Sequence, residues 1–276
     1  MDLSQLPLAE IALLVLVVTV AGLGAGFIAG LLGVGGGIVL VPVLSEVWAF
    51  LGVAPELRLP LAVGTSLATI FPTAIRSTSG HHRKGAVDWA LLRAWTPATV
   101  LGACAGMVLA RFLGGAGLTM AFAAGASFLA ILLMTTNEAT RIADKPPEGA
   151  AAWPYAAGNG ALSAMMGIGG GAFGATILTL HGYAIHRAIG TSAGFGLMIA
   201  VPGTIGMIVN GWGQQGLPPL SLGYVNLLAM FLIVPATMIS TPWGVAAAHA
   251  LDRTALRRIF AAFLLLTALR MLAKAF

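Results

Sequence analysis

Residues 26–42, GFIAGLLGVGGGIVLVP, place three consecutive glycines inside an otherwise apolar segment. A second copy lies at residues 160–176, GALSAMMGIGGGAFGAT. The cores GVGGG and GIGGG differ only by valine for isoleucine and begin 134 residues apart in a chain of 276. The sequence therefore predicts two related halves, each built around one glycine triplet: Gly35, Gly36 and Gly37 in the first and Gly169, Gly170 and Gly171 in the second.

The composition indicates a membrane protein. Hydrophobic residues make up 58% of the chain and charged residues 8%, and the mean hydropathy is +0.95. A soluble domain carries about 25% charged residues, so the lipid bilayer is the expected partner. The net charge of +5 is not gathered into a basic block, which argues against nucleic-acid binding. The single Cys104 excludes an internal disulfide.

A spanning helix needs about 20 apolar residues, and ten apolar segments can be marked, five in each half. The predicted fold is all-α: a polytopic membrane protein with about ten transmembrane segments. Its expected divisions are a first membrane repeat (1–140), a polar linker (141–152) and a second membrane repeat (153–276). The segments are Leu8 to Leu32, Gly36 to Leu51, Leu59 to Ser77, Val87 to Phe112, Leu118 to Thr136, Trp153 to Ile168, Gly170 to His181, His186 to Asn210, Leu222 to Ala250 and Leu256 to Lys274.

An odd number of crossings in each half predicts that the second half is threaded upside down, as an inverted five-plus-five repeat. Cytoplasmic loops carry an excess of Lys and Arg. With the basic loop around Arg83 inside, ten of the 14 Lys and Arg residues lie inside and both termini lie outside.

The second and seventh segments are shorter than a usual spanning helix and are expected to be broken helices that begin within the membrane, either as re-entrant hairpins or as full crossings. A first helical turn presents unpaired N–H groups and the positive end of the helix dipole. Two such turns related by a pseudo-two-fold axis predict an anion site near the midplane. The alternative is that the glycines only allow close helix packing, and this is favoured for Gly22, Gly26 and Gly30.

Paired hydroxyls accompany the triplets. The sequence Gly64-Thr65-Ser66 recurs as Gly190-Thr191-Ser192, near the start of the third segment of each half. These hydroxyls can donate to a bound oxyanion or cap a helix, and the sequence leaves both open. The predicted substrate-binding hydroxyls are Thr65, Ser66, Thr191 and Ser192.

Ionisable residues near membrane depth are costly unless functional or paired. Arg76 either neutralises a passing anion or anchors the orientation of its segment. Glu46 is either a proton-coupling carboxylate or half of a buried pair. His81 and His82 are expected in a solvated loop.

Asn159 either lines the pathway or satisfies backbone groups. No close cluster of metal ligands is evident, and no cofactor or metal is expected.

These motifs resemble the TauE/SafE family of membrane permeases. The resemblance rests on Gly33-Val-Gly-Gly-Gly, the following Val41-Pro42, Gly64-Thr65-Ser66 and the copies in the second half, and it covers nearly the whole chain. It implies a transporter of the prokaryotic plasma (inner) membrane for small sulfur-containing anions such as sulfite, sulfoacetate or other organosulfonates. Members are typically described as exporters, although uptake occurs among relatives, and the glycine motifs are the implied substrate contacts. The second copy has Ala175-Thr176 in place of Val-Pro, which weakens the case for a symmetric site.

The interpretation reached is a transporter that moves a small anion by alternating access, coupled to a proton or sodium ion, with the oligomeric state left open. A passive anion channel is the alternative. An intramembrane enzyme is less favoured because no Ser-His or Asp-Asp pairing occurs in the apolar segments.

Overall fold

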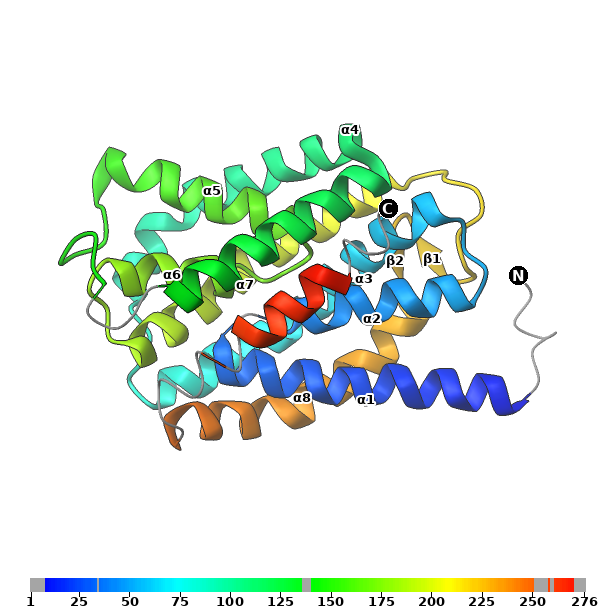
Figure 1. The fold of residues 1–276 in the computed structure, drawn as a ribbon, viewed down its shortest axis with the longest axis horizontal. Coiled ribbons are helices and arrows are strands. Elements are labelled where there is room, and N and C mark those ends of the chain that lie inside the picture. Colours follow the sequence, from blue (N-terminus) through cyan, green and yellow to red (C-terminus); the bar gives the residue numbers. More distant parts are fainter. Residues whose placement is uncertain (1–7, 34, 136–139, 251–257, 259–260, 271–276) are drawn as a thin grey trace.

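Apolar stretches become helices in a bilayer because lipid offers the backbone no hydrogen-bond partner. The computed structural model describes residues 8–33, 35–135, 140–250, 258 and 261–270 (Figure 1). In this part of the chain the all-α prediction is confirmed, apart from one short hairpin. The helices are α1 (Leu8–Leu32), α2 (Gly37–Phe50), α3 (Pro55–Arg83), α4 (Trp89–Thr135), η2 (Gly149–Ala151), α5 (Ala152–Met165), α6 (Gly171–Leu180), α7 (Ile185–Asn210), α8 (Leu227–Ala250) and an unlabelled helix at Ala261–Arg270.

Five of these helices are long and apolar enough to cross a bilayer within the described ranges: α1, α3, α4, α7 and α8. The helices α2, α6 and Ala261–Arg270 are apolar but shorter. The two short helices predicted after the glycine triplets are confirmed, with 14 residues in α2 and 10 in α6. The total of ten crossings stays a prediction.

The helix α4 is interrupted at Gly114, whose φ of 61° and ψ of −167° are not helical. Figure 1 shows the ribbon doubling back within α4. Residues 89–113 and 115–135 therefore correspond to the fourth and fifth predicted segments, and the predicted turn between Phe112 and Leu118 is confirmed.

Two predicted boundaries are wrong by clearly more than one helical turn. The ninth segment was expected to begin at Leu222, but Ser221–Leu222 (β1) pairs antiparallel with Val225–Asn226 (β2) and α8 starts only at Leu227. The turn of this hairpin is held by the N–H of Tyr224, which donates to the carbonyl of Met207 at 3.2 Å. The third segment was expected to end at Ser77, but α3 continues to Arg83.

Helices from opposite halves of the chain pack in pairs, α1 along α8 and α4 along α5, while α3 and α7 lie against each other. The close packing expected at Gly26 and Gly30 is present, because a Cβ at either position would collide with the backbone of α8. A Cβ at Gly102 or Gly160 would collide in the same way between α4 and α5. Small residues at these crossings let the backbones approach closely.

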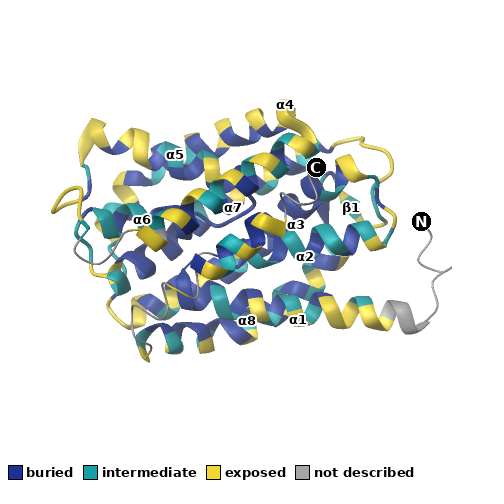
Figure 2. Ribbon diagram, in the orientation of Figure 1, coloured by how far each residue is buried: buried dark blue, intermediate teal, exposed yellow. Residues whose placement is uncertain are grey.

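Large apolar side chains remain exposed on the outer faces of the peripheral helices (Figure 2). Leu16 on α1 is 59% exposed and Phe112 on α4 is 79% exposed. Many large apolar side chains exposed on the outside suit lipid rather than water, in agreement with the composition.

Candidate functional site

Each glycine triplet ends in a left-handed residue that begins a short helix. Gly36 precedes α2 at φ 76°, and Gly170 precedes α6 at φ 73°. A residue with a Cβ enters this region at a cost of about 1–2 kcal/mol. As glycines, these two N-cap residues have no side chain that could cap the helix. The first-turn N–H groups therefore receive no bond from an N-cap side chain, and the positive ends of both helix dipoles lack this cap.

The two triplets contact each other in the interior. A Cβ built on Gly35 would lie 3.2 Å from the Cα of Gly169, and one on Gly169 would lie 3.3 Å from the Cα of Gly35. The Cγ2 of Ile70, on α3, would lie 3.0 Å from both of these positions. All six triplet glycines are buried, so the motifs meet in a closed arrangement with Ile70 beside both.

Each glycine motif also packs on the third helix of the other half. A Cβ at Gly33 would collide with the carbonyl oxygen of Ile189 on α7. A Cβ at Gly167 would lie 3.0 Å from the Cα of Val63 on α3. The hydroxyl of Ser66 donates to the carbonyl of Gly167 at 2.8 Å. Because each motif packs on a helix of the other half, residues more than a hundred positions apart in the sequence lie in one site.

The threonine hydroxyls tie the halves together in the same reciprocal way. The Oγ1 of Thr65, on α3, accepts a hydrogen bond from the N–H of Asn226 at 2.9 Å. The Oγ1 of Thr191, on α7, accepts one from the N–H of Asp88 at 2.9 Å. Neither threonine caps its own helix, because α3 and α7 begin earlier, so that alternative is wrong for both. As acceptors, both hydroxyls keep their hydrogen for a further partner.

The two serines are not equivalent. Ser66 reaches across to Gly167, whereas Ser192 donates to the carbonyl of Ile189 in its own helix at 3.0 Å. Both are fully buried. The pair therefore departs from symmetry at the centre of the molecule.

A buried polar stripe runs along α3 from the glycine motifs, and the sequence analysis missed it. The Oγ1 of Thr73 donates to the Oγ1 of Thr237 at 2.9 Å, and Ser77 donates to the carbonyl of Ala29 at 3.1 Å. Its positions share one helix face because they are three or four residues apart. The members are Ser66, Thr69, Thr73, Ser77 and His81.

His81 is not solvated, which corrects the expectation from sequence; His82 is exposed as expected. His81 lies in the last turn of α3, 1% exposed, with its Nε2 2.9 Å from the carbonyl oxygen of Gly30. Its ring centroid is 5.5 Å from that of His249, which is 5.2 Å from that of His186. No sequence signal marks this cluster, because its members come from three helices far apart along the chain.

The two charged candidates lie away from the triplets. Arg76 is exposed on α3, where the orientation-anchor alternative places it. Glu46, on α2, has an oxygen 3.4 Å from a guanidinium nitrogen of Arg270. Their side chains are 34% and 65% exposed, so Glu46 is part of an ion pair that is not buried.

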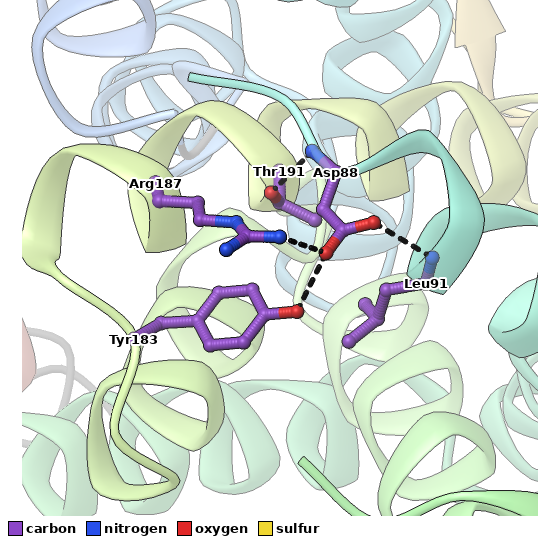
Figure 3. A network of polar contacts seen from close by, with 5 residues as sticks. All are labelled: Asp88, Leu91, Tyr183, Arg187 and Thr191. Carbon is purple, nitrogen blue, oxygen red and sulfur yellow. Dashed lines mark hydrogen bonds and ion pairs between the residues drawn. The ribbon is translucent and has the colours of Figure 1, made fainter. Parts of the chain in front are cut away.

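Asp88 connects the loop before α4 to the loop before α7 (Figure 3). Its Oδ2 accepts hydrogen bonds from the hydroxyl of Tyr183 at 2.7 Å and from Arg187 at 2.6 Å. Its Oδ1 accepts the N–H of Leu91 at 3.0 Å and thereby caps α4. Thr191 completes the network through the backbone of Asp88.

These contacts shift the titration of both loop groups. Burial alone would raise the pKa of Asp88, but hydrogen bonds from Tyr183, Leu91 and Arg187, with the charge of Arg187, bring it below its ordinary value. Burial, followed by the hydrogen bond to Asp88, raises the pKa of Tyr183 to about 12. At neutral pH Asp88 is therefore a carboxylate and Tyr183 a neutral donor.

A cavity of about 220 Å³ opens at the other end of the molecule. It is lined by residues of α3, α4, α7 and the loop before α8, among them Glu56, Arg111, Asn210 and Tyr224. A smaller cavity of about 60 Å³ lies near Leu51 and Pro219. Neither of these two cavities is lined by a triplet glycine.

The bundle, its apolar exterior and the half-helices define the class: an α-helical, multi-pass membrane protein. A family model described as Sulfite exporter TauE/SafE matches residues 18–271. The chain therefore belongs to the TauE/SafE family, a membrane transport family, and the resemblance seen in the sequence is confirmed.

Relatives support the same assignment. A probable membrane transporter protein of Haemophilus influenzae is 32% identical over 263 residues, covering 94% of this chain and 98% of the relative. One of Methanocaldococcus jannaschii is 25% identical over 228 residues, covering 82% and 84%. No solved structure matches the chain.

Proposed function

We propose that the protein moves a small sulfur-containing oxyanion across the membrane by alternating access, with the two short helices as its anion contacts. The observation that carries this proposal is the meeting of two uncapped half-helices, begun by Gly36 and Gly170, through contact of Gly35 with Gly169. Helix N-termini bind anions through free N–H groups and the helix dipole. Transporters with broken helices use such termini near the midplane.

The proposed contacts are the backbone N–H groups of the two triplets and four hydroxyls. Thr65 and Thr191 support this role because each hydroxyl accepts a hydrogen bond from a backbone N–H and can still donate one. Arg76 would attract the anion as it approaches. The full set is Gly35, Gly36, Gly37, Gly169, Gly170, Gly171, Thr65, Ser66, Thr191, Ser192 and Arg76.

An inverted repeat of five plus five segments accounts for the exchanges between halves. Gly26 on α1 approaches Thr237 on α8 closely, as Gly160 on α5 approaches Thr99 on α4. The pairs Thr65 with Asn226 and Thr191 with Asp88 follow the same relation. We assign 1–140 and 153–276 to the two repeats and 141–152 to the linker.

The orientation proposed places the Asp88 network inside the cell and the 220 Å³ cavity outside, with both termini outside, in a prokaryotic inner membrane. Support comes from the grouping of loops: the loop that follows Arg83 and the loop before α7 meet through the contact of Asp88 with Arg187. Arg111 borders the opposite cavity. This division agrees with the excess of basic residues assigned to the inside.

Gated passage is favoured over an open channel by one observation. Ile70 is fully buried and contacts the space between both triplets, so an anion reaches them only when α3 or its neighbours move. A proton or sodium ion would drive the motion, with Glu46 as the coupling candidate because its pair with Arg270 is half-exposed and can break.

The family description points to sulfite and to export as the first substrate and direction to test. Purified protein in proteoliposomes would be offered sulfite, thiosulfate, sulfoacetate, taurine and sulfate, with and without a proton or sodium gradient. We expect saturable, gradient-dependent flux of at least one sulfur anion. Flux that neither saturates nor responds to any gradient would support a channel and contradict alternating access.

A further inference from the structure

Asn159 on α5 has an unsatisfied donor in the interior. The residue is 2% exposed, and its Nδ2 has no hydrogen-bond partner among the described residues. Its Oδ1 accepts a bond from Ser163 at 3.3 Å, which orients the amide. A buried donor without a partner is rare in folded proteins and calls for an explanation, such as a ligand.

The free amide faces the start of α6. A Cβ built on Gly170 would lie 3.4 Å from the Nδ2 of Asn159. Gly170 is the left-handed residue that begins this 10-residue helix, and as a glycine it supplies no side-chain cap. The unpaired N–H₂ group and the uncapped helical turn thus lie side by side, and both are donors that an anion accepts from.

The first half of the chain lacks this arrangement. Asn159 and Ala25 occupy matching places, 11 residues before Gly170 and Gly36 respectively. A Cβ on Gly36 would lie 2.6 Å from the carbonyl oxygen of Ala25 and 3.1 Å from its Cβ. The first motif therefore faces a methyl group and an acceptor, whereas the second faces a donor.

We infer that the two motifs contribute unequally: the oxyanion binds most strongly at the start of α6, where Asn159 donates to it, while the start of α2 offers backbone N–H groups alone. This inference rests on the proposed transport function and names the ligand residue of that site. Asn159 is then a residue that contacts the bound anion through its N–H₂ group. An isosteric carboxylate in its place would repel the anion.

The test compares Asn159→Ala and Asn159→Asp with the wild type in proteoliposomes, using sulfite and the other four anions as probes. A hydrogen bond to a charged group contributes enough that its loss should raise KM about 10- to 100-fold in Asn159→Ala. Asn159→Asp should show no saturable anion flux.

A second readout separates binding from folding. Ligand that binds only the folded protein raises its melting temperature, and this rise should disappear in both variants. The matched control is Asn210→Ala, because the amide of Asn210 already donates to the carbonyl of Met107 at 2.8 Å. That control should keep the wild-type KM and the anion-induced shift.

The outcomes separate the two levels of the proposal. Wild-type KM and an undiminished anion shift in both variants overturn the role of Asn159 and leave the transport proposal standing. A wild type that neither moves nor is stabilised by any of the five anions overturns the transport proposal itself. Where Asn159→Asp gives no folded protein, Asn159→Ala decides the question.

Discussion

Gly170 is the residue on which the second half-helix depends. Its φ of 73° is strained for any other residue, and a Cβ there would collide with the Cδ1 of Ile199. Gly36 has the same conformation in the first half. Both positions could be predicted from sequence, because three glycines within an apolar run have few uses other than an unusual backbone.

We expect Gly170→Ala to destabilise the protein by at least about 1–2 kcal/mol, the cost of a left-handed alanine, and to reduce sulfite flux. Thermal unfolding in detergent and proteoliposome flux would measure both effects. The control is Gly158→Ala in the same half, where no atom lies within 4 Å of the new Cβ. If Gly170→Ala is as stable as this control, the left-handed cap does not govern the fold.

Side-chain partners at the residue scale could not be predicted. Thr65 and Ser66 are neighbours in sequence, yet Thr65 accepts from Asn226 while Ser66 donates to Gly167. Which partner each residue meets depends on how α3 packs against the second half of the chain, and the sequence does not specify that packing. The burial of His81 was missed for the same reason.

At the scale of the elements, glycines set how closely α1 and α8 approach. Gly26 faces Thr237 and Ser240, whereas Gly24 on the same helix has no neighbour within 4 Å. The four-residue spacing of Gly22, Gly26 and Gly30 indicated a helix-packing face, so their packing role was correctly predicted. The identity of the partner helix, α8, could not be predicted from this spacing.

We expect Gly26→Val to destabilise the protein by about 1–3 kcal/mol, since overpacking forces helices apart. Gly24→Val is the matched control and should change stability by much less. Chemical or thermal unfolding of the two variants in the same detergent gives the comparison. Equal losses in both would mean that valine disfavours α1 itself and that the contact with α8 contributes nothing.

The Asp88 network joins two loops and has a defined pH dependence. Because the folded pKa of Asp88 is below its ordinary value, its stabilisation is present above about pH 4 and is lost as the pH falls through the folded pKa. Asp88→Asn should therefore lower stability at pH 7 and flatten its acid dependence. The loss of unfolding free energy should stay within about 1 kcal/mol, because exposed ion pairs contribute little to stability. The side chain of Arg187 is 56% exposed.

Melting temperatures of the wild type and Asp88→Asn, measured from pH 7 downwards, would check this. The two curves should converge in acid. Parallel curves across the whole range would show that the ionisation of Asp88 does not contribute to stability.

At the scale of the whole molecule, opposite threading of the halves is the prediction with the widest reach. In a Cys104→Ala background, Lys84→Cys and Gln214→Cys place single thiols at exposed positions in two loops. An impermeant thiol reagent applied to intact cells should label Gln214→Cys, whereas Lys84→Cys should react only after the membrane is opened. Labelling of both from outside would refute the orientation.

The sequence predicted the helical class, the two breaks after the glycine triplets, the interruption between Phe112 and Leu118 and the family, because each leaves a local pattern of glycine, charge or hydropathy. The sequence alone could not predict that the two halves of the site bind the anion differently. The contrast between Asn159 and Ala25 became meaningful only once their neighbours at Gly170 and Gly36 were known. A repeat in sequence indicates common architecture and says little about which copy still binds.

The exchange of helices between halves has a consequence for biosynthesis. The helix α8 packs along α1, and the hydroxyl of Thr65 accepts a hydrogen bond from Asn226, the residue directly before α8. A ribosome delivers α1 and α3 long before α8 exists. The newly inserted first half must therefore stay in the bilayer with Gly26 and Gly30 of α1 not yet packed against another helix. Folding is complete only when α8 has been synthesised and packs against α1.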